Sequence, residues 1–186
     1  MEERGHILNV LEETKAALKR DDYLKIKNLS NRVLHVSSIE QDPDIISVAV
    51  VLYSLSKLIE RENYQTYKNW PKFYKNYIEG LNRLTDSLKR NDINKFRKDM
   101  DFIRNIIQRL SGNLKIYISD VFRKARINKA SRIYEHGISM EKTAKILGIS
   151  IWELAEYAGQ SGIADVNLSV TLPVKERIKI AEEIFG

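Results

Sequence analysis

The sequence predicts an all-α fold, and three observations support this. Apolar residues recur at helical spacing along almost the whole chain. Only 8 Gly and 3 Pro occur among 186 residues, so turns should be few and the elements long. Hydrophobic residues make up 43% and charged residues 30%, a composition typical of globular proteins. We therefore expect an N-terminal helical bundle over residues 1–111, followed by a second region of shorter elements over residues 112–186.

The bundle should begin with three helices. Apolar stripes over residues 7–18 and 24–36 predict the first two, and the charged residues 19–22 separate them. Asp42-Pro43-Asp44 then provides a cap, a proline at the first helical position and an acid in the first turn. The helix that follows is apolar nearly all round in its first two turns, so we expect it to lie at the centre of the bundle.

Three further helices are expected before residue 136. One should run from Pro71 to about Arg90, and Asn91-Asp92 should cap another that extends through Leu110. Ser111-Gly112-Asn113 is the best candidate for a boundary within the second half of the chain. A basic helix should follow it, from Leu114 towards His136.

A repeated Gly-Ile-Ser sequence marks the start of two short helices. Gly137-Ile138-Ser139 is echoed eleven residues later by Gly148-Ile149-Ser150. In each copy the glycine can end one helix in the left-handed conformation, and the serine can cap the next. Helices are therefore expected over about 140–147 and 151–160, the second with a capping box between Ser150 and Glu153.

The C-terminal tail is expected to contain a short strand and a final helix. Val166, Leu168 and Val170 alternate with polar residues, and a helix should begin at Pro173. A lone strand finds no partner in the rest of the chain. It would have to pair with a second copy of the chain or with another protein.

The two short helices and their turn fit the helix-turn-helix pattern, which many DNA-binding proteins use. The pattern needs a small residue midway along the first helix, a residue that tolerates positive φ at the turn, and apolar residues that hold both helices to the core. The residues at these places are Ala144, Leu147, Gly148, Ile149 and Leu154.

Residues 132–163 also resemble a family of small prokaryotic proteins regarded as antitoxins. The matching residues are Tyr134, Gly137, Ile138, Ser139, Ala144, Gly148, Ile149, Ser150, Trp152, Glu153, Gly162 and Ile163. Because this family is associated with PIN-domain nuclease toxins, the resemblance implies a DNA-binding regulator that also holds a nuclease partner. It covers about a fifth of the chain. The sequence departs from the family at Thr143, where a second Ala is usual, and in its roughly 110-residue N-terminal region.

The positive charge is concentrated in the middle of the chain. Residues 61–140 contain 18 Lys and Arg against 8 Asp and Glu, whereas residues 1–60 and 141–186 are each slightly acidic. A local cationic surface is what a phosphate-bearing partner requires. The other interpretation is a set of solvated helices. The residues expected to contact DNA phosphates are Lys115, Arg123, Lys124, Arg126, Lys129, Arg132, Lys142 and Lys145.

The second short helix would be the one that reads DNA bases, although its charge is unusual for that role. It contains no Lys or Arg, while Glu153 and Glu156 are acidic. The residues expected to face the bases are Ser150, Ile151, Trp152, Glu156 and Gln160. Because phosphate neutralisation supplies most DNA affinity, a helix-turn-helix used only for protein contacts remains an alternative.

A cluster of aromatic residues between positions 64 and 77 allows another function. Lys68, Lys72 and Lys75 lie among its rings, a mixture that suits stacking on the bases of single strands. The six aromatic residues are Tyr64, Tyr67, Trp70, Phe73, Tyr74 and Tyr77. Several of them share helical spacing, so a stripe packed on the bundle is the commoner explanation.

The composition argues against catalysis and metal chemistry. The chain has no Cys and only three His, at positions 6, 35 and 136, so we expect no metal site and no cofactor. Asp42 and Asp44 are accounted for by capping. The Arg–His pairs 32/35 and 132/136 lack the spacing used by one helical class of toxin nucleases. We find no nucleophile–base pair or phosphate loop, and expect no enzyme.

The sequence as a whole favours a cytoplasmic, DNA-binding helix-turn-helix regulator, antitoxin-like and dimeric. Its longest uncharged run, residues 45–56, is too short for a membrane span, and the acidic N-terminus is unlike a signal peptide. Double-stranded DNA is the expected partner, together with a second copy of the chain and a protein such as a PIN-domain nuclease. The alternatives are a protein-interaction module and a single-strand or RNA binder.

Overall fold

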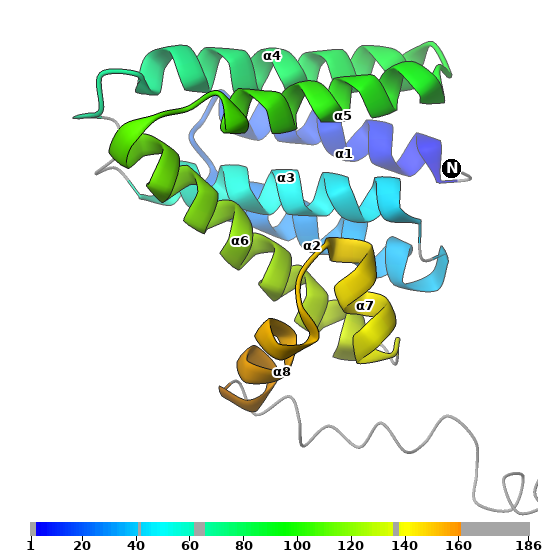
Figure 1. The fold of residues 1–186 in the computed structure, drawn as a ribbon. Helices are drawn as coiled ribbons and strands as arrows, with labels where there is room; N and C mark the ends of the chain where they lie inside the picture. Colours follow the sequence, from blue (N-terminus) through cyan, green and yellow to red (C-terminus); the bar gives the residue numbers. More distant parts are fainter. Residues whose placement is uncertain (1–2, 41, 62–65, 136–137, 161–186) are drawn as a thin grey trace, which may run out of the picture. The chain divides into compact units, whose positions relative to one another are not determined.

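The structure, a computed structural model, describes residues 3–40, 42–61, 66–135 and 138–160 (Figure 1). These residues form helices joined by turns, with no strand among them, which confirms the all-α prediction for this part of the chain. The strand and helix expected over residues 165–186 lie outside the described residues. No helix in the described ranges has the length and apolar character that crossing a membrane would need.

The described residues form eight helices, whose labels are those of Figure 1. Their bounds are α1 Arg4–Leu18, α2 Tyr23–Glu40, α3 Pro43–Glu60, α4 Trp70–Lys89, α5 Ile93–Gln108, α6 Gly112–Glu135, α7 Met140–Leu147 and α8 Ile151–Gln160. The predicted helices over these ranges are confirmed, with differences of a few residues at their ends. The Asp42 cap is also confirmed, since its Oδ1 accepts a hydrogen bond from the Asp44 amide at 2.8 Å.

The chain divides into two compact units, residues 1–129 and residues 130–186. The boundary predicted from the sequence lies between residues 111 and 112. That position is the turn between α5 and α6, but α6 then continues without a break past Lys129. The sequence from Leu114 to Glu135 contains no Gly or Pro that would end the helix. The division between the units therefore falls within α6.

The first unit is built around α3, as its apolar sequence predicted. Its buried residues include Ile45, Ile46 and Val51, which lie on different sides of the helix. α2 packs against α3, α1 contacts both α2 and α4, and α4 packs against α5. The hydroxyl of Ser30 donates to the Ala49 carbonyl at 2.7 Å. The hydroxyl of Tyr77 donates to the Val51 carbonyl at 2.8 Å, so α2 and α4 are both tied to the backbone of α3.

Three helices end in the same hydrogen-bonded motif, in which one residue adopts positive φ. That residue is Asp21 after α1 and Asn91 after α4, with φ of 50° and 57°. The amide of the next residue then donates to the carbonyl five residues earlier, from Asp22 to Ala17 at 3.1 Å and from Asp92 to Ser87 at 2.9 Å. These are Schellman-type ends, which satisfy carbonyls left free at the end of a helix. Asp22 and Asp92 also cap the next helices, because their carboxylates accept hydrogen bonds from the amides of Lys25 and Lys95.

The seam between α4 and α5 is close at Gly80. A Cβ atom placed on Gly80 would lie 2.5 Å from Cγ1 and 3.1 Å from Cδ1 of Ile103. Ile103 is itself buried in α5. The absence of a side chain at Gly80 therefore allows the α4 backbone to approach this isoleucine.

Candidate nucleic-acid interface

The second unit contains the predicted pair of short helices, α7 and α8, which pack against each other. Gly148 ends α7 in the left-handed conformation, with φ 61° and ψ 40°. The Ile149 amide then bonds to the Ala144 carbonyl at 3.1 Å, which repeats the ending seen in α1 and α4. This confirms the left-handed glycine predicted at this turn. Glycine suits the position because positive φ is costly for residues that have a Cβ atom.

Both helices begin at the predicted serine caps. The Ser139 hydroxyl accepts a hydrogen bond from the Lys142 amide at 3.3 Å. In α8 the Ser150 hydroxyl accepts from the Glu153 amide at 3.1 Å, and the Ser150 amide donates to the Glu153 carboxylate at 3.0 Å. This reciprocal pair is the capping box expected from the sequence. Glu153 is therefore engaged in forming the helix start.

One side of the pair is apolar and buried. Ala144 and Leu147 of α7 and Leu154 of α8 are buried as predicted, and Ala158 joins them; the side chain of Ile149 is half-buried. Thr143, where the resemblance leads us to expect Ala, is also buried. Its hydroxyl finds no hydrogen-bond partner among the residues that the structure describes. An alanine here would remove a buried hydroxyl that has no partner among the described residues.

The opposite side of α8 is open to solvent. Trp152 is 83% exposed and Ile151 is 45% exposed, which is unusual for large apolar residues in a folded unit. All five residues expected to face the bases are exposed, namely Ser150, Ile151, Trp152, Glu156 and Gln160. The Gln160 amide donates to the Glu156 carboxylate at 3.3 Å, one turn earlier on the same side of the helix. The structure therefore places these side chains on an accessible surface.

Lys129 is a correction to the predicted phosphate contacts. Its side chain is fully buried, and its Nζ donates to Oδ1 of Asn31 at 2.7 Å. The same Nζ lies 4.2 Å from the centre of the Tyr53 ring, a cation–π distance. Lys129 follows Arg123 and Arg126 at intervals of three residues, which groups it with these arginines in the sequence, but the lysine points into the first unit. It cannot reach a DNA phosphate in this structure.

The other cations of the predicted set differ in what they contact. Arg123 and Lys124 both pair with Asp120, at 3.6 and 2.8 Å. The hydrogen bond from Lys124 is the largest cause that lowers the pKa of Asp120, and the charges of Lys124 and Arg123 add to it. Arg126 is half-buried and Arg132 is exposed. Lys115, Lys142 and Lys145 are exposed and have no ion pair within the described ranges.

The aromatic residues between positions 64 and 77, most of which lie in α4, pack mainly as a core stripe. Trp70, Phe73 and Tyr77 are buried, which confirms the packed-stripe interpretation for these three residues. Tyr74 is half-buried and stacks on Trp70, with ring centroids 5.4 Å apart. Tyr67 is partly exposed, and Tyr64 lies outside the described residues. Most of the rings therefore are not available for stacking on nucleic-acid bases.

Sequence reasoning missed a pocket beside this segment. It is lined in part by Asn69 and Asn76 of the α4 region and by Arg109 after α5. Lys72, also in the lining, belongs to the aromatic–basic cluster that the sequence indicates. The helical spacing of residues 69, 72 and 76 could have placed them on one face, but the contribution of α5 depends on how the two helices pack.

No family model, no curated protein and no solved structure matches this chain.

Proposed function

We propose that this chain is a DNA-binding regulator that reads duplex DNA with α8. The observation that carries the proposal is the arrangement of this helix after a tight, glycine-ended turn. Leu154 and Ala158 are buried on one side, while the five residues expected to face bases are exposed. In helix-turn-helix proteins the first residues of the second helix contact base edges in the major groove.

The exposed side chains offer chemistry suited to base edges. Ser150 and Gln160 can donate and accept hydrogen bonds, and the carboxylate of Glu156 can accept from the amino group of cytosine. Ile151 and Trp152 can contact the methyl group of thymine. Because Gln160 already bonds to Glu156, binding a base would exchange that weak contact for one to DNA.

Phosphate neutralisation has to come from outside α8, which has no Lys or Arg. Within the second unit, Lys142 and Lys145 of α7 are exposed and Arg132 is exposed at the end of α6. In α6, Lys115 is exposed, whereas Arg123 and Lys124 would first have to loosen their pairs with Asp120. Lys142 and Lys145 are therefore the first residues to test as phosphate contacts.

The finer parts of the proposal rest on the resemblance stated for residues 132–163. It favours an antitoxin-like regulator that acts as a dimer and holds a protein such as a PIN-domain nuclease. Dimerisation would double the DNA interface by reading two half-sites. Sedimentation of the full chain over a range of concentrations would show whether a dimer forms.

The salt dependence of DNA binding tests the proposal. Fluorescence anisotropy should detect binding of the full chain to duplex DNA, with affinity that falls as salt rises. Replacing both Lys142 and Lys145 by Ala should make the slope of log K against log[salt] less negative by about 1.8, because each lost phosphate contact contributes about 0.9.

A charge-matched control separates phosphate contacts from a general effect of net charge. Lys19 and Arg20 are exposed in the turn after α1, and replacing both by Ala removes the same charge. This control should leave the slope unchanged. Equal slopes for all three proteins, or no binding at low salt, would contradict the proposal.

A second candidate function, protein docking through α8, is favoured by the exposure of Trp152 and Ile151. An aromatic side chain that is 83% exposed resembles the anchor residues of protein interfaces. In this case a partner should copurify from native extract with the full chain and not with Trp152→Ala. Substituting Lys142 and Lys145 would leave that association intact, which distinguishes it from DNA binding.

A further inference from the structure

A pocket of about 400 Å³ lies along the α4–α5 pair of the first unit. Lys72 and Asn76 lie on one face of α4, and Asn69, three residues before Lys72, immediately precedes the helix. Phe102 comes from α5, and Arg109 and Ser111 come from the turn before α6. These residues all belong to the same compact unit, so the pocket is formed within one packed body. We call it the α4–α5 pocket.

The inner wall of the α4–α5 pocket is apolar. Phe73 and Ile106 are buried beneath it, and the half-buried Phe102 and Leu110 also line it. The buried rings of Trp70 and Phe73 contact each other with centroids 5.5 Å apart, which fixes this wall in the core. The pocket can therefore cover a flat apolar group on one side.

The rim of the pocket is polar and carries excess positive charge. Lys72 and Arg109 are exposed, and neither forms an ion pair within the part of the chain that the structure describes. The side chains of Asn69 and Asn76 likewise form no hydrogen bond among the described residues, and Asn69 does not cap α4. Two cations and two amides are thus available to a ligand.

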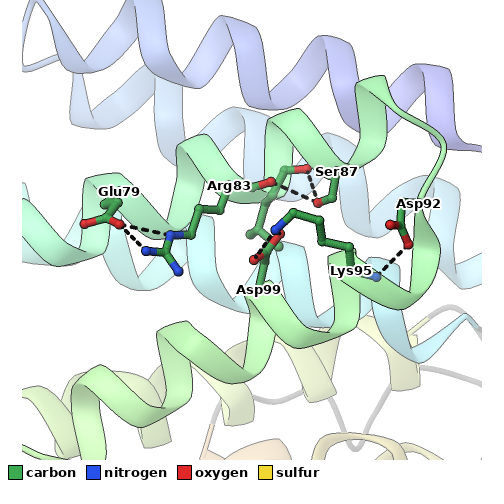
Figure 2. A network of polar contacts seen from close by, with 7 residues as sticks. Glu79, Arg83, Ser87, Asp92, Lys95 and Asp99 are labelled. Atoms are coloured by element: carbon green, nitrogen blue, oxygen red, sulfur yellow. Dashed lines mark hydrogen bonds and ion pairs between the residues drawn. The ribbon is translucent and has the colours of Figure 1, made fainter.

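The single acid in the lining, Glu79, is already neutralised. Its Oε1 accepts from Nε of Arg83 at 3.0 Å and from Nη2 of the same residue, as Figure 2 shows. The Arg83 guanidinium also lies 4.1 Å from the centre of the Phe102 ring. Because this pair cancels, Lys72 and Arg109 set the charge of the pocket.

We propose that the α4–α5 pocket binds a small phosphorylated molecule of nucleotide size. The phosphate would contact Lys72 and Arg109, and a planar group would lie on the apolar wall, where Phe102 and Leu110 are partly exposed. Asn69 and Asn76 would donate or accept hydrogen bonds at the rim. This inference does not depend on DNA binding by α8.

Fluorescence of Trp70 provides a direct test, because this residue adjoins Asn69 and contacts Phe73. Replacing Trp152 by Phe in the full chain leaves Trp70 as the sole tryptophan. Titration with adenosine monophosphate should change its fluorescence with saturation. Adenosine and inorganic phosphate should each bind at least tenfold more weakly, since each lacks one half of the proposed contacts.

Substitutions then locate the site. Lys72→Ala and Arg109→Ala should each weaken binding about tenfold. Lys98→Ala is the matched control: Lys98 is exposed on α5 and outside the pocket lining, so its loss should not change the affinity. Circular dichroism of each variant should match that of the parent, which shows that the fold is retained.

Several results would overturn the proposal. One is the absence of binding at millimolar adenosine monophosphate, and another is an equal effect of Lys98→Ala and Lys72→Ala. Equal affinity for inorganic phosphate would remove the role of the apolar wall, and equal affinity for adenosine would remove that of the cations. Binding of an eight-nucleotide thymidine strand without binding of the mononucleotide would instead indicate a single-strand interface.

Discussion

Replacing Gly80 by Ala tests the packing of α4 against α5. The new Cβ would lie 2.5 Å from Cγ1 of Ile103, well inside the contact distance of about 3.5–4.0 Å between carbon atoms. Relieving this overlap by moving buried groups costs about 1–3 kcal/mol. Alanine recovers about 0.5–1 kcal/mol over glycine in a helix, so the free energy of unfolding should fall by up to about 2.5 kcal/mol.

In a protein that also carries Ile103→Ala, the effect of Gly80→Ala on the free energy of unfolding should have the opposite sign. Ile103→Ala alone should cost about 2–5 kcal/mol, because it leaves a cavity in the core. With the isoleucine truncated, the nearest remaining contact of the new Cβ is Cδ1 of Phe102 at 3.6 Å, an ordinary separation. Gly80→Ala should then stabilise the protein by about 0.5–1 kcal/mol. The two substitutions should therefore couple by about 1–3 kcal/mol.

Urea unfolding followed by Trp70 fluorescence measures these values for the first unit. The full chain carries Trp152→Phe, so that the signal comes from Trp70 alone. Gly5→Ala in α1 is a suitable control, because no atom lies within 4 Å of the Cβ it would add. That control should be neutral or slightly stabilising in both backgrounds. If Gly80→Ala stabilised the protein equally with and without Ile103, the described close approach would be refuted.

Two further predictions concern the α8 cap and an ion pair in the first unit. Ser150→Ala should destabilise the start of α8 by about 1 kcal/mol, and hydrogen exchange at the Glu153 amide should become about fivefold faster; unchanged exchange would contradict the capping box. Hydrogen bonds from Arg32 and then Lys25 lower the pKa of Glu13, so its ionised form stabilises the fold at neutral pH, and this contribution is lost as the pH falls through the lowered pKa. Glu13→Gln should therefore reduce the drop in urea midpoint between about pH 5 and pH 3, and an identical drop in both proteins would exclude this pair as a cause.

The features that could be predicted from the sequence are those set by neighbouring residues. The Asp42 cap, the Ser150–Glu153 box and the left-handed Gly148 each involve residues within a few positions of one another. Their geometry follows from backbone conformation and side-chain reach, so a short sequence is enough to specify it.

Features that depend on distant residues were not predicted. Lys129 shares helical spacing with Arg123 and Arg126, but its partner Asn31 lies 98 residues away in the sequence. The α4–α5 pocket likewise requires Arg109 to meet residues from the start of α4. The pairing of Arg123 and Lys124 with Asp120 is local, by contrast, and its spacing of three and four residues indicates it in advance.

Selection from a library of random duplexes tests the central claim, that α8 reads DNA. The full chain should enrich a common short motif after repeated rounds of binding and amplification. Gln160→Ala should relax the preference at one position of that motif, whereas Lys142→Ala with Lys145→Ala should weaken enriched and unselected duplexes alike. Failure to enrich any motif, with equal affinity for the starting and final pools, would contradict the claim.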